Sequence, residues 1–411
     1  MNSLIDLIKL SPDQKNAMDF IVSELGKKTM LVTMGGYAGV GKTTVTAKIV
    51  EALRPRFKRI AFACYTGKAK SVLEAKLRAF NALAETDFCG TLHQLLYRPL
   101  THEERERTAA GHDHITMETS FETPEGRGPI PYDLIILDEA SMVNETIYDD
   151  LVALNVPILA VGDHGQLKPV FGNFNLMENP MIRLEQIHRQ AEGNPIIKVS
   201  MLAREEGDIP YGEWTGEDGT RVIKTRDRSI LAGIPNLWDW MIITATNAMR
   251  CRANAYVRRR RFGTAYSDKP MPGDKLICLA NNHGAKIFNG MVGILEEYRN
   301  MEGDLSHLLK ARIDFGETIY DGLIFKYQFG KPRACKETQP ECPKVHPQDF
   351  GDLIDYGFAL TCHKSQGSEM DCVVVQEEAG MKRRMQQDGT WRRWLYTAAT
   401  RSRKQLIIVG E

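Results

Sequence analysis

A glycine-rich stretch that ends in lysine and threonine carries the strongest chemical signal in this sequence. Residues 36–44 read Gly-Tyr-Ala-Gly-Val-Gly-Lys-Thr-Thr and match the phosphate-loop pattern G-x-x-x-x-G-K-[ST]. Glycines let such a loop bend tightly, so its backbone N–H groups converge on phosphate oxygens at a helix N-terminus. In this pattern Lys42 reaches the β- and γ-phosphates, and the Thr43 hydroxyl holds Mg²⁺. The stretch therefore predicts a site for a nucleoside triphosphate.

A pair of carboxylates, Asp138 and Glu139, forms the second chemical signal. The pair follows the apolar run 134–137, which reads as a buried strand. A carboxylate at the end of such a strand can hold Mg²⁺ beside the phosphates, and its neighbour can orient or deprotonate the attacking water. Two acids after a strand often only cap the next helix. With a phosphate loop upstream, we favour the catalytic pair.

Several polar residues occupy positions where strands are expected to lead into helices. They are Thr66, Lys68, Thr91 and His93 in the first third of the chain, and Gln166 after the apolar run 157–161. Open α/β sheets place their ligand-binding loops at such junctions. The Gln166 amide could contact the γ-phosphate or the water. By residue type alone, the other four read as ordinary loop residues.

Two arginines are candidate cationic groups, and each has an alternative interpretation. Arg189 lies in the stretch 184–190, and an isolated arginine is usually a solvated surface residue. Arg401 lies near the end of a helical stretch that leads into the apolar run 406–409. A structural salt bridge is the alternative for Arg401.

The elements that must position these residues are those of an α/β protein. Met30–Met34 reads as a buried strand before the phosphate loop, and Thr44–Leu53 has apolar residues at helical spacing after it. Further upstream, Ser11 followed by Pro12 is a typical helix start. Strands and helices alternate up to the middle of the chain, and the alternation restarts near residue 220.

Two polar segments interrupt this alternation, at 98–131 and 296–356. In the first, His114–Phe121 alternates apolar and polar residues and predicts an exposed strand. The second has short β-like fragments and contains Cys335, Cys342 and His346. Zinc sites usually space paired cysteines by two to four residues and need a fourth ligand, so loop thiols are the favoured interpretation.

Composition limits the class of protein. The chain has 411 residues, which is enough for two to four domains, and its 53 basic residues balance its 53 acidic residues. A nucleic-acid footprint must therefore be a local patch. The run Arg258–Arg261 could contact phosphates, although a solvated helix end is an equal alternative. The 8 cysteines show no disulfide framework, and we expect no secretory or membrane-spanning segment and a reducing cytoplasm.

Taken together, these motifs resemble those of superfamily 1 DNA helicases, on the branch that holds RecD and the phage Dda helicases. The matching segments occur in family order and span nearly the whole chain. They are Leu10–Gln14, Gly36–Thr44, Tyr65–Lys70, Gly90–Gln94, Leu137–Ser141, Val161–Leu167, Gln186–Gln190, Leu360–Glu369 and Tyr396–Arg403. The sequence His-Lys-Ser-Gln-Gly at 363–367 favours the RecD/Dda branch.

The resemblance implies two RecA-like P-loop core domains, each carrying a small and largely β insertion. The first core domain would comprise 1–97 and 132–190, with 98–131 inserted as a hairpin that splits the duplex. The second would comprise 191–295 and 357–411, with 296–356 inserted as an SH3-like subdomain. These boundaries rest on position, because neither insertion matches the family closely in sequence.

The resemblance also assigns roles to individual residues. Glu139 would activate the water, Gln166 would sense the γ-phosphate, and Arg189 and Arg401 would be arginine fingers. Mg²⁺ would be held by Thr43 and Asp138. Contacts to ATP would come from Gln14 at the adenine, from Gly367 and Glu369 near the ribose, and from Gly36, Ala38, Gly39, Val40, Gly41, Lys42, Thr43 and Thr44 at the phosphates. Single-stranded DNA would lie along Thr66, Lys68, Thr91, His93, His363 and Lys364, with Phe121 as the wedge.

The function implied is that of an ATP-dependent DNA helicase that moves 5′ to 3′ on single-stranded DNA. The expected partners are single-stranded DNA and its junctions with duplex, with a single-strand-binding protein or a replisome component as candidates. A monomer in a bacterial or phage-infected cytoplasm is expected. Two alternatives remain: a translocase that strips proteins from DNA, and a helicase-like subunit of a nuclease complex.

Overall fold

The computed structural model describes residues 9–27, 29–107, 113–122, 124, 129–169, 174–186, 193–282, 284–316, 318–335 and 351–410. The chain divides into two compact units. The first unit comprises Met1–Tyr65, Ala69–His164 and Lys168–Gln186. The second comprises Thr66–Lys68, Gly165–Leu167 and Ile187–Glu411. Two short segments of the N-terminal half thus belong to the second unit.

A parallel sheet forms the centre of the first unit. Its six strands lie in the order β3-β2-β6-β7-β1-β8. In chain order the strands are β1 (Leu31–Gly36), β2 (Ile60–Cys64), β3 (Phe88–Thr91), β6 (Leu134–Asp138), β7 (Ile158–Gly162) and β8 (Ile182–Leu184). The helices are α1 (Pro12–Gly26), α2 (Lys42–Leu53), α3 (Gly67–Ala79), α4 (Leu92–Leu96) and α5 (Glu145–Ala153). Since every strand pair is parallel, the carboxyl ends share one edge of the sheet.

Hydrophobic burial explains why these strands pair. On one face, alternate residues of β2, β6 and β7 pack in one cluster with α4 and α5, because strand side chains point to opposite faces in turn. Ile135 and Leu137 of β6 are fully buried there. On the N-terminal side, α1 begins at the predicted Ser11–Pro12 start, and a capping box links Ser11 to Gln14.

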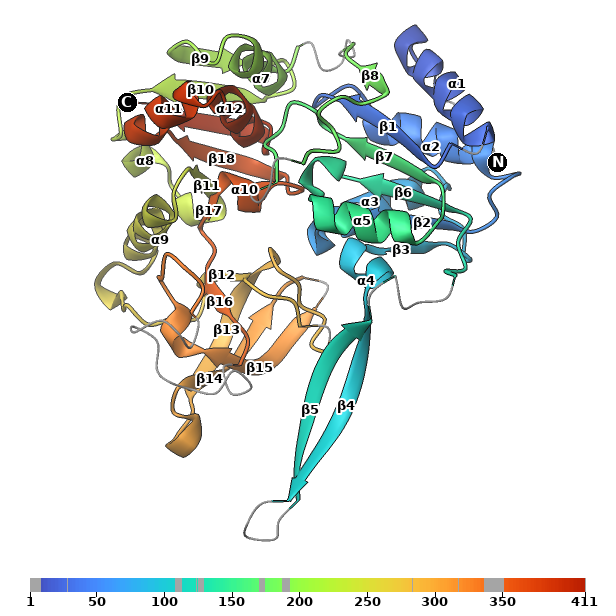
Figure 1. Ribbon diagram of the computed structural model, residues 1–411. Coiled ribbons are helices and arrows are strands. Elements are labelled where there is room, and N and C mark those ends of the chain that lie inside the picture. Colours follow the sequence, from blue (N-terminus) through green and yellow to red (C-terminus); the bar gives the residue numbers. More distant parts are fainter. Residues whose placement is uncertain are drawn as a thin grey trace. The chain divides into compact units, whose positions relative to one another are not determined.

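The predicted exposed strand in 98–131 is one half of a long hairpin. β4 (Arg98–Arg107) and β5 (Asp113–Glu122) pair antiparallel over their full length, from Arg98↔Glu122 to Arg107↔Asp113. The two strands form a sheet of their own and are drawn as a slender ribbon in Figure 1.

A second six-stranded sheet organises the second unit, in the order β17-β11-β18-β19-β10-β9. Its strands are β9 (Gly212–Thr215), β10 (Arg221–Thr225), β11 (Met241–Thr244), β17 (Ala359–Thr361), β18 (Met370–Gln376) and β19 (Ser402–Val409). All pairs are parallel except β9 with β10. Its helices are α7 (Pro195–Glu205), α8 (Ile230–Gly233), α9 (Asn247–Phe262), α10 (Cys362–Ser365), α11 (Ala379–Gln387) and α12 (Trp391–Ala399).

A smaller sheet lies between β11 and β17 in the sequence. Its five antiparallel strands lie in the order β15-β14-β13-β12-β16. They are β12 (Lys275–Cys278), β13 (Val292–Asn300), β14 (Leu308–Asp314), β15 (Ile319–Phe325) and β16 (Ile354–Tyr356). The sheet thus begins before the boundary predicted at 296, because β12 pairs with both β13 and β16.

The predicted α/β class is confirmed by these two largely parallel sheets, each accompanied by a small antiparallel element (Figure 1). Among the described residues, no helix has both the length and the apolar character needed to cross a membrane.

Candidate active site

The phosphate loop connects the carboxyl end of β1 to the first turn of α2. Gly39 and Gly41 have φ angles of 82° and 80°, in the left-handed region that favours glycine. A Cβ on Gly36 would lie 2.8 Å from a methyl carbon of Val40, so this position also requires glycine. Gly41 is the N-cap of α2 and offers no side chain to the first N–H groups of the helix. Those donors suit an anion.

The ammonium group of Lys42 points back into this loop. Its Nζ donates to the carbonyl oxygens of Gly36, at 2.8 Å, and of Tyr37, at 3.1 Å. No ion pair of Lys42 occurs within the part of the chain that the structure describes. Phosphate oxygens would therefore compete only with neutral carbonyls for this charge.

Gln14, predicted to read adenine, connects α1 to the phosphate loop. Its Oε1 accepts from the backbone N–H of Ser11, at 3.1 Å, and its Nε2 donates to the carbonyl of Val40, at 3.0 Å. The side chain is almost fully buried. An adenine contact would require the amide to exchange one of these bonds, so the predicted role stays a prediction.

The two predicted carboxylates follow β6 at the same edge of the sheet. Glu139 has a φ angle of 55°, which is uncommon for a residue with a side chain, and its N–H donates to Oδ1 of Asp138, at 3.0 Å. Burial raises the pKa of Asp138, whereas the Glu139 N–H and the positive charge of Lys42 lower it. Lys42 thus acts electrostatically on Asp138, which brings the loop and the acid pair into one site.

The oxygen groups at this edge fit Mg²⁺. Thr43 offers a hydroxyl at the start of α2, and Asp138 offers a half-buried carboxylate. Mg²⁺ prefers oxygen ligands, keeps several waters and is usually held by one or two protein groups together with phosphates. Across the described ranges, no group of three His, Cys, Asp or Glu side chains gathers as a metal cage. One hydroxyl and one carboxylate are a set that would suit a cation held together with phosphates.

Tyr37 and His164 form a contact in the first unit that the sequence did not predict. Their ring centroids are 4.1 Å apart, so the phosphate loop packs on the second residue after the end of β7. A Cβ on Gly35 would lie 2.8 Å from Nδ1 of His164, which explains the glycine there. Burial lowers the pKa of His164. Both residues occupy variable positions of their motifs, so no sequence signal could have paired them.

Gln166 belongs to the second unit, although it follows β7 of the first sheet in the chain. It is 4% exposed, and within the described residues its Oε1 accepts no hydrogen bond. Arg393 donates from Nη1 to the Gln166 carbonyl, at 3.1 Å. The main chain of Gln166 is therefore fixed, while its side-chain oxygen remains available.

Arg401 lies between α12 and β19 and is also 4% exposed. Its guanidinium donates to the carbonyls of Thr397, at 3.0 Å, and Ser368, at 3.2 Å, and to the hydroxyl of Thr400, at 3.2 Å. In the described chain no carboxylate forms an ion pair with it. The structural salt bridge considered as the alternative is therefore absent from the described residues. The other predicted finger, Arg189, lies outside them.

Glu369 and Arg401 both lie close enough to Lys68 to act on it electrostatically. Burial lowers the pKa of Lys68, the charges of Arg403 and Arg401 lower it further, and Glu369 opposes them. Lys68 and neighbouring Thr66 belong to the second unit, like Glu369. Gly367, with a φ angle of 68°, provides the turn before Glu369.

The other predicted DNA contacts differ in their availability. Thr91 is the N-cap of α4, where its hydroxyl accepts from the N–H of Gln94 at 3.3 Å, and it is buried. His93 is half-buried between the rings of Tyr65 and Tyr97. On α10, Lys364 is exposed, and burial lowers the pKa of His363. Thr91 thus has a clear structural role beside the predicted one.

Phe121, the predicted wedge, is paired with Pro99 in the hairpin. The hairpin has ten paired positions, from Arg98↔Glu122 at its base to Arg107↔Asp113 at its far end. Pro99↔Phe121 is the second pair from the base. A wedge at the far end of the ribbon would therefore have to be another residue. The wedge role of Phe121 stays a prediction.

Two of the four arginines at the end of α9 make contacts that hold the fold together. Arg258 is buried and donates to both carboxylate oxygens of Asp274, at 2.8 and 3.0 Å. Arg260 caps the end of α8 through the carbonyls of Leu231, Ala232 and Ile234. The two alternatives considered from the sequence, a solvated helix end and a phosphate contact, are therefore wrong for Arg258, which is buried and paired with an acid.

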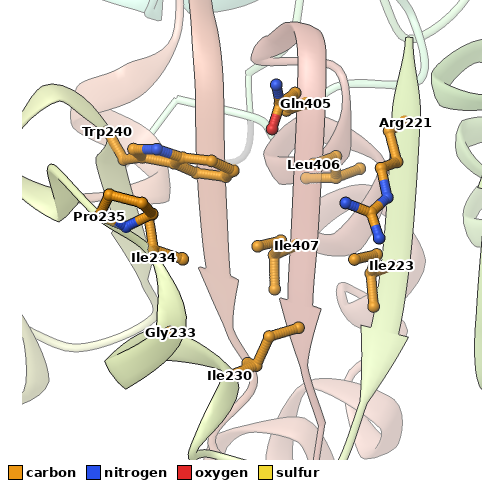
Figure 2. Close-up of a pocket in the computed structure, with 10 residues that line it drawn as sticks. All are labelled: Arg221, Ile223, Ile230, Gly233, Ile234, Pro235, Trp240, Gln405, Leu406 and Ile407. Carbon is orange, nitrogen blue, oxygen red and sulfur yellow. The ribbon is translucent and has the colours of Figure 1, made fainter. Parts of the chain in front are cut away.

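Two further features lie apart from the predicted site. Cys335 packs in an apolar cluster with Leu308 and Phe325, while Cys342 and His346 lie outside the described residues. A recess of about 340 Å³ opens on the second sheet, with Ile223, Ile407 and Trp240 in its walls and Arg221 and Gln405 at one end (Figure 2). None of the predicted site residues lines it.

Two family models match the chain. One, described as an AAA domain, matches residues 9–224, which is more than half of the 411 residues. The chain belongs to the AAA domain family. The other model, described as a UvrD-like helicase C-terminal domain, matches residues 356–409 of this AAA-domain protein.

Similar curated proteins confirm the resemblance to the RecD/Dda branch. The ATP-dependent RecD2 DNA helicase of Deinococcus radiodurans is 26% identical, over 98% of this chain and 49% of its own length. The ATP-dependent DNA helicase dda of Enterobacteria phage T4 is 26% identical, over 62% of this chain and 58% of its own length. The RecBCD enzyme subunit RecD of Mycobacterium tuberculosis is 25% identical, over 98% of this chain and 71% of its own length. The AAA-domain protein thus spans about half the length of the first two relatives.

Solved structures agree on the fold. Bacteroides Pif1 bound to single-stranded DNA aligns with a TM-score of 0.53 and 19% identity, over 98% of this chain and 92% of that chain. Bacteroides Pif1 in complex with ADP-AlF3 and single-stranded DNA aligns with a TM-score of 0.52 and 17% identity, over 98% of this chain and 93% of that chain. The predicted fold class, two RecA-like cores with small β insertions, is confirmed.

Proposed function

We propose that this protein is an ATP-dependent DNA helicase that moves 5′ to 3′ along single-stranded DNA. The observation that carries the proposal is Arg401 between α12 and β19, which is buried, has three neutral acceptors and has no ion pair with a described acid. A lone nucleotide-binding module would need neither the second sheet nor such a cation. The proposed site residues are those predicted from the sequence. The proposed domain boundaries are also those predicted, except that the small antiparallel sheet begins at β12.

In the proposed reaction, Lys42 and the N–H groups of the phosphate loop bind the β- and γ-phosphates of ATP. Thr43 and Asp138 would hold Mg²⁺, which would supply positive charge beside the transferring phosphoryl group. Glu139 accepts a proton from the attacking water, and Gln166 positions that water or the γ-phosphate with its side-chain amide. Arg401 adds positive charge at the transition state. Phosphoryl transfer requires charge neutralisation from several sides, so hydrolysis depends on all these groups together.

The proposed substrate is single-stranded DNA and its junction with duplex. Lys68, His93, His363 and Lys364 would contact the strand, and the β4–β5 hairpin would separate the duplex. Contacts to the phosphate backbone suffice for stepping, so little sequence preference is expected. Two Pif1 structures of similar fold contain single-stranded DNA, which supports the proposal. A cytoplasmic location and an interaction with a single-strand-binding protein belong to the same proposal.

A second candidate function is that of a helicase subunit in a larger nuclease complex. It is favoured by the similarity to RecD subunits of the RecBCD enzyme, over 98% of this chain. Activity of the isolated chain distinguishes the two, because a subunit that works only in a complex would unwind poorly alone.

Strand displacement tests the proposal directly. The purified chain, with ATP and Mg²⁺, should displace the strand of a duplex with a 5′ single-stranded tail and fail on one with a 3′ tail. Lys42→Ala should remove the activity on the 5′-tailed substrate while single-strand binding persists. Preferential displacement from 3′ tails would refute the direction, and ATP-independent displacement would refute the motor.

A further inference from the structure

The segment Gly165–Leu167 is held by the second unit through three hydrogen bonds. The N–H of Leu167 donates to the hydroxyl of Thr397, at 2.9 Å. The Leu167 carbonyl accepts from Nε2 of Gln366, at 3.0 Å, and the Gln166 carbonyl accepts from Nη1 of Arg393, at 3.1 Å. Since Gln166 carries the side chain assigned to the γ-phosphate, these bonds determine where that side chain is placed.

Thr397 differs from its partners because it also holds Arg401. Its hydroxyl accepts from Leu167, and its carbonyl accepts from Nε of Arg401, at 3.0 Å. Thr397 is fully buried in α12. One rigid residue on one helix thus contacts both the loop of the predicted γ-phosphate sensor and the predicted arginine finger.

The neighbouring threonine shows that this arrangement is not the usual one for a helix. Thr400, the C-cap of α12, donates its hydroxyl to the carbonyls of Tyr396 and Thr397 in the preceding turn, which is a common local bond for a threonine. The Thr397 oxygen accepts instead from a backbone N–H 230 residues away in the sequence. A hydroxyl used in this way fixes a distant loop rather than its own helix.

We infer that Thr397 is a positioning residue. It fixes the position of the Gln166 side chain relative to the guanidinium of Arg401. The inference rests on the proposed function, because it takes the roles of Gln166 and Arg401 from it. Thr397 touches neither nucleotide nor DNA and acts through these two residues. When both must meet the same phosphoryl group, a small displacement of one relative to the other lowers the rate of hydrolysis without lowering ATP affinity.

The test is the steady-state ATPase of the full chain with saturating single-stranded DNA. Thr397→Val keeps the shape and removes the acceptor, so kcat should fall about tenfold, the effect of one lost hydrogen bond. KM for ATP and the Kd for single-stranded DNA should change by less than about twofold. Thr397→Ser keeps the hydroxyl and should restore most of kcat. Thr220→Val, at another buried threonine of the second unit, should behave as wild type.

The outcomes separate this inference from the function on which it rests. A wild-type chain without DNA-stimulated ATPase would refute the function. A stimulated wild type together with an unchanged kcat in Thr397→Val, or with no rescue by Thr397→Ser, would refute the positioning role alone. If Thr397→Val does not fold, Arg393→Met removes another of the three bonds from a half-buried position. It should lower kcat severalfold at unchanged KM, and a wild-type kcat would overturn the inference.

Discussion

Helix α9 and the segment from α12 to β19 both bury arginines, and they surround them differently. On α9, Arg258 is paired with Asp274 and lies 3.9 Å from the ring centre of Tyr356, and Arg250 is paired with Asp355 at 2.8 Å. After α12, Arg401 has two carbonyls and one hydroxyl as acceptors. The charge is compensated in the first region and left uncompensated by any described acid in the second.

The difference distinguishes two uses of a buried cation. Breaking a buried pair such as Arg258–Asp274 would leave one charge buried without a partner, which strongly destabilises the fold. Such a pair therefore has a structural role. An arginine that is held only by neutral acceptors can still pair with an anion that arrives later, although Arg260 shows that such acceptors can also belong to a structural cap. Lys42 in the first unit resembles Arg401, with two carbonyls as acceptors. Neutral partners, together with the places of Lys42 in the phosphate loop and of Arg401 after α12, make both cations candidates for phosphate.

Arg401→Ala gives the largest expected effect. An arginine finger is worth about 10³–10⁵ in rate, so DNA-stimulated kcat should fall by at least about 10³. The affinity for ATP should fall much less, as measured by binding of a fluorescent analogue. Loss of affinity alone, with kcat preserved, would contradict the finger role and the comparison with α9.

Lys42→Ala should lower ATPase by about 10²–10³, the usual cost of removing one donor from a charged transition state. Thermal unfolding should change little, because its ammonium bonds only the carbonyls of its own loop. A large loss of thermal stability would instead show that Lys42 has a structural role, like Arg258.

Arg258→Met should destabilise the second unit by about 3–5 kcal/mol, because Asp274 would be left buried and unpaired. Denaturant unfolding measures this loss. Arg221→Met is the matched control, since its ion pair with Glu213 is exposed and such pairs contribute about 0–1 kcal/mol. Equal effects in the two variants would contradict a structural role for the buried Arg258–Asp274 pair.

The last prediction concerns Lys275, a half-buried cation whose protonation should make the stability of the fold depend on pH. Burial lowers its pKa to about 8, and it has no ion pair among the described residues. Below pH 8 the ammonium is charged in both states, and the folded state bears the cost of burying it. From pH 8 to about 10.4 the folded state loses the proton first, so stability rises with pH. Lys275→Met should flatten this rise in unfolding free energy, and an unchanged slope would contradict the lowered pKa.

Local patterns in the sequence predicted the phosphate loop, the helix start at Ser11 and the acid pair after β6. Each of these depends on neighbouring residues, such as glycines that need positive φ and an apolar run that must be a strand. The RecA-like cores and the branch were predicted because many such motifs occur in order.

Contacts between distant segments could not be predicted. The run at 258–261 looks like a solvated helix end until Asp274 is known to face Arg258. The attachment of Leu167 to Thr397 depends on tertiary packing across 230 positions, and no local pattern encodes it. The membership of β12 in the small sheet was missed for the same reason, because its partner β16 lies far along the chain.

The regular pairing of the β4–β5 ribbon limits how its length can change. Each strand has 10 residues, equivalent to about 33 Å at roughly 3.3 Å per residue. Since side chains alternate between the two faces, deleting one residue from each strand would exchange the faces of everything beyond the cut. Removing two residues from each strand preserves them. Insertions and deletions in this ribbon should therefore come in matched steps of two, which makes it an adjustable spacer for engineered or natural variants.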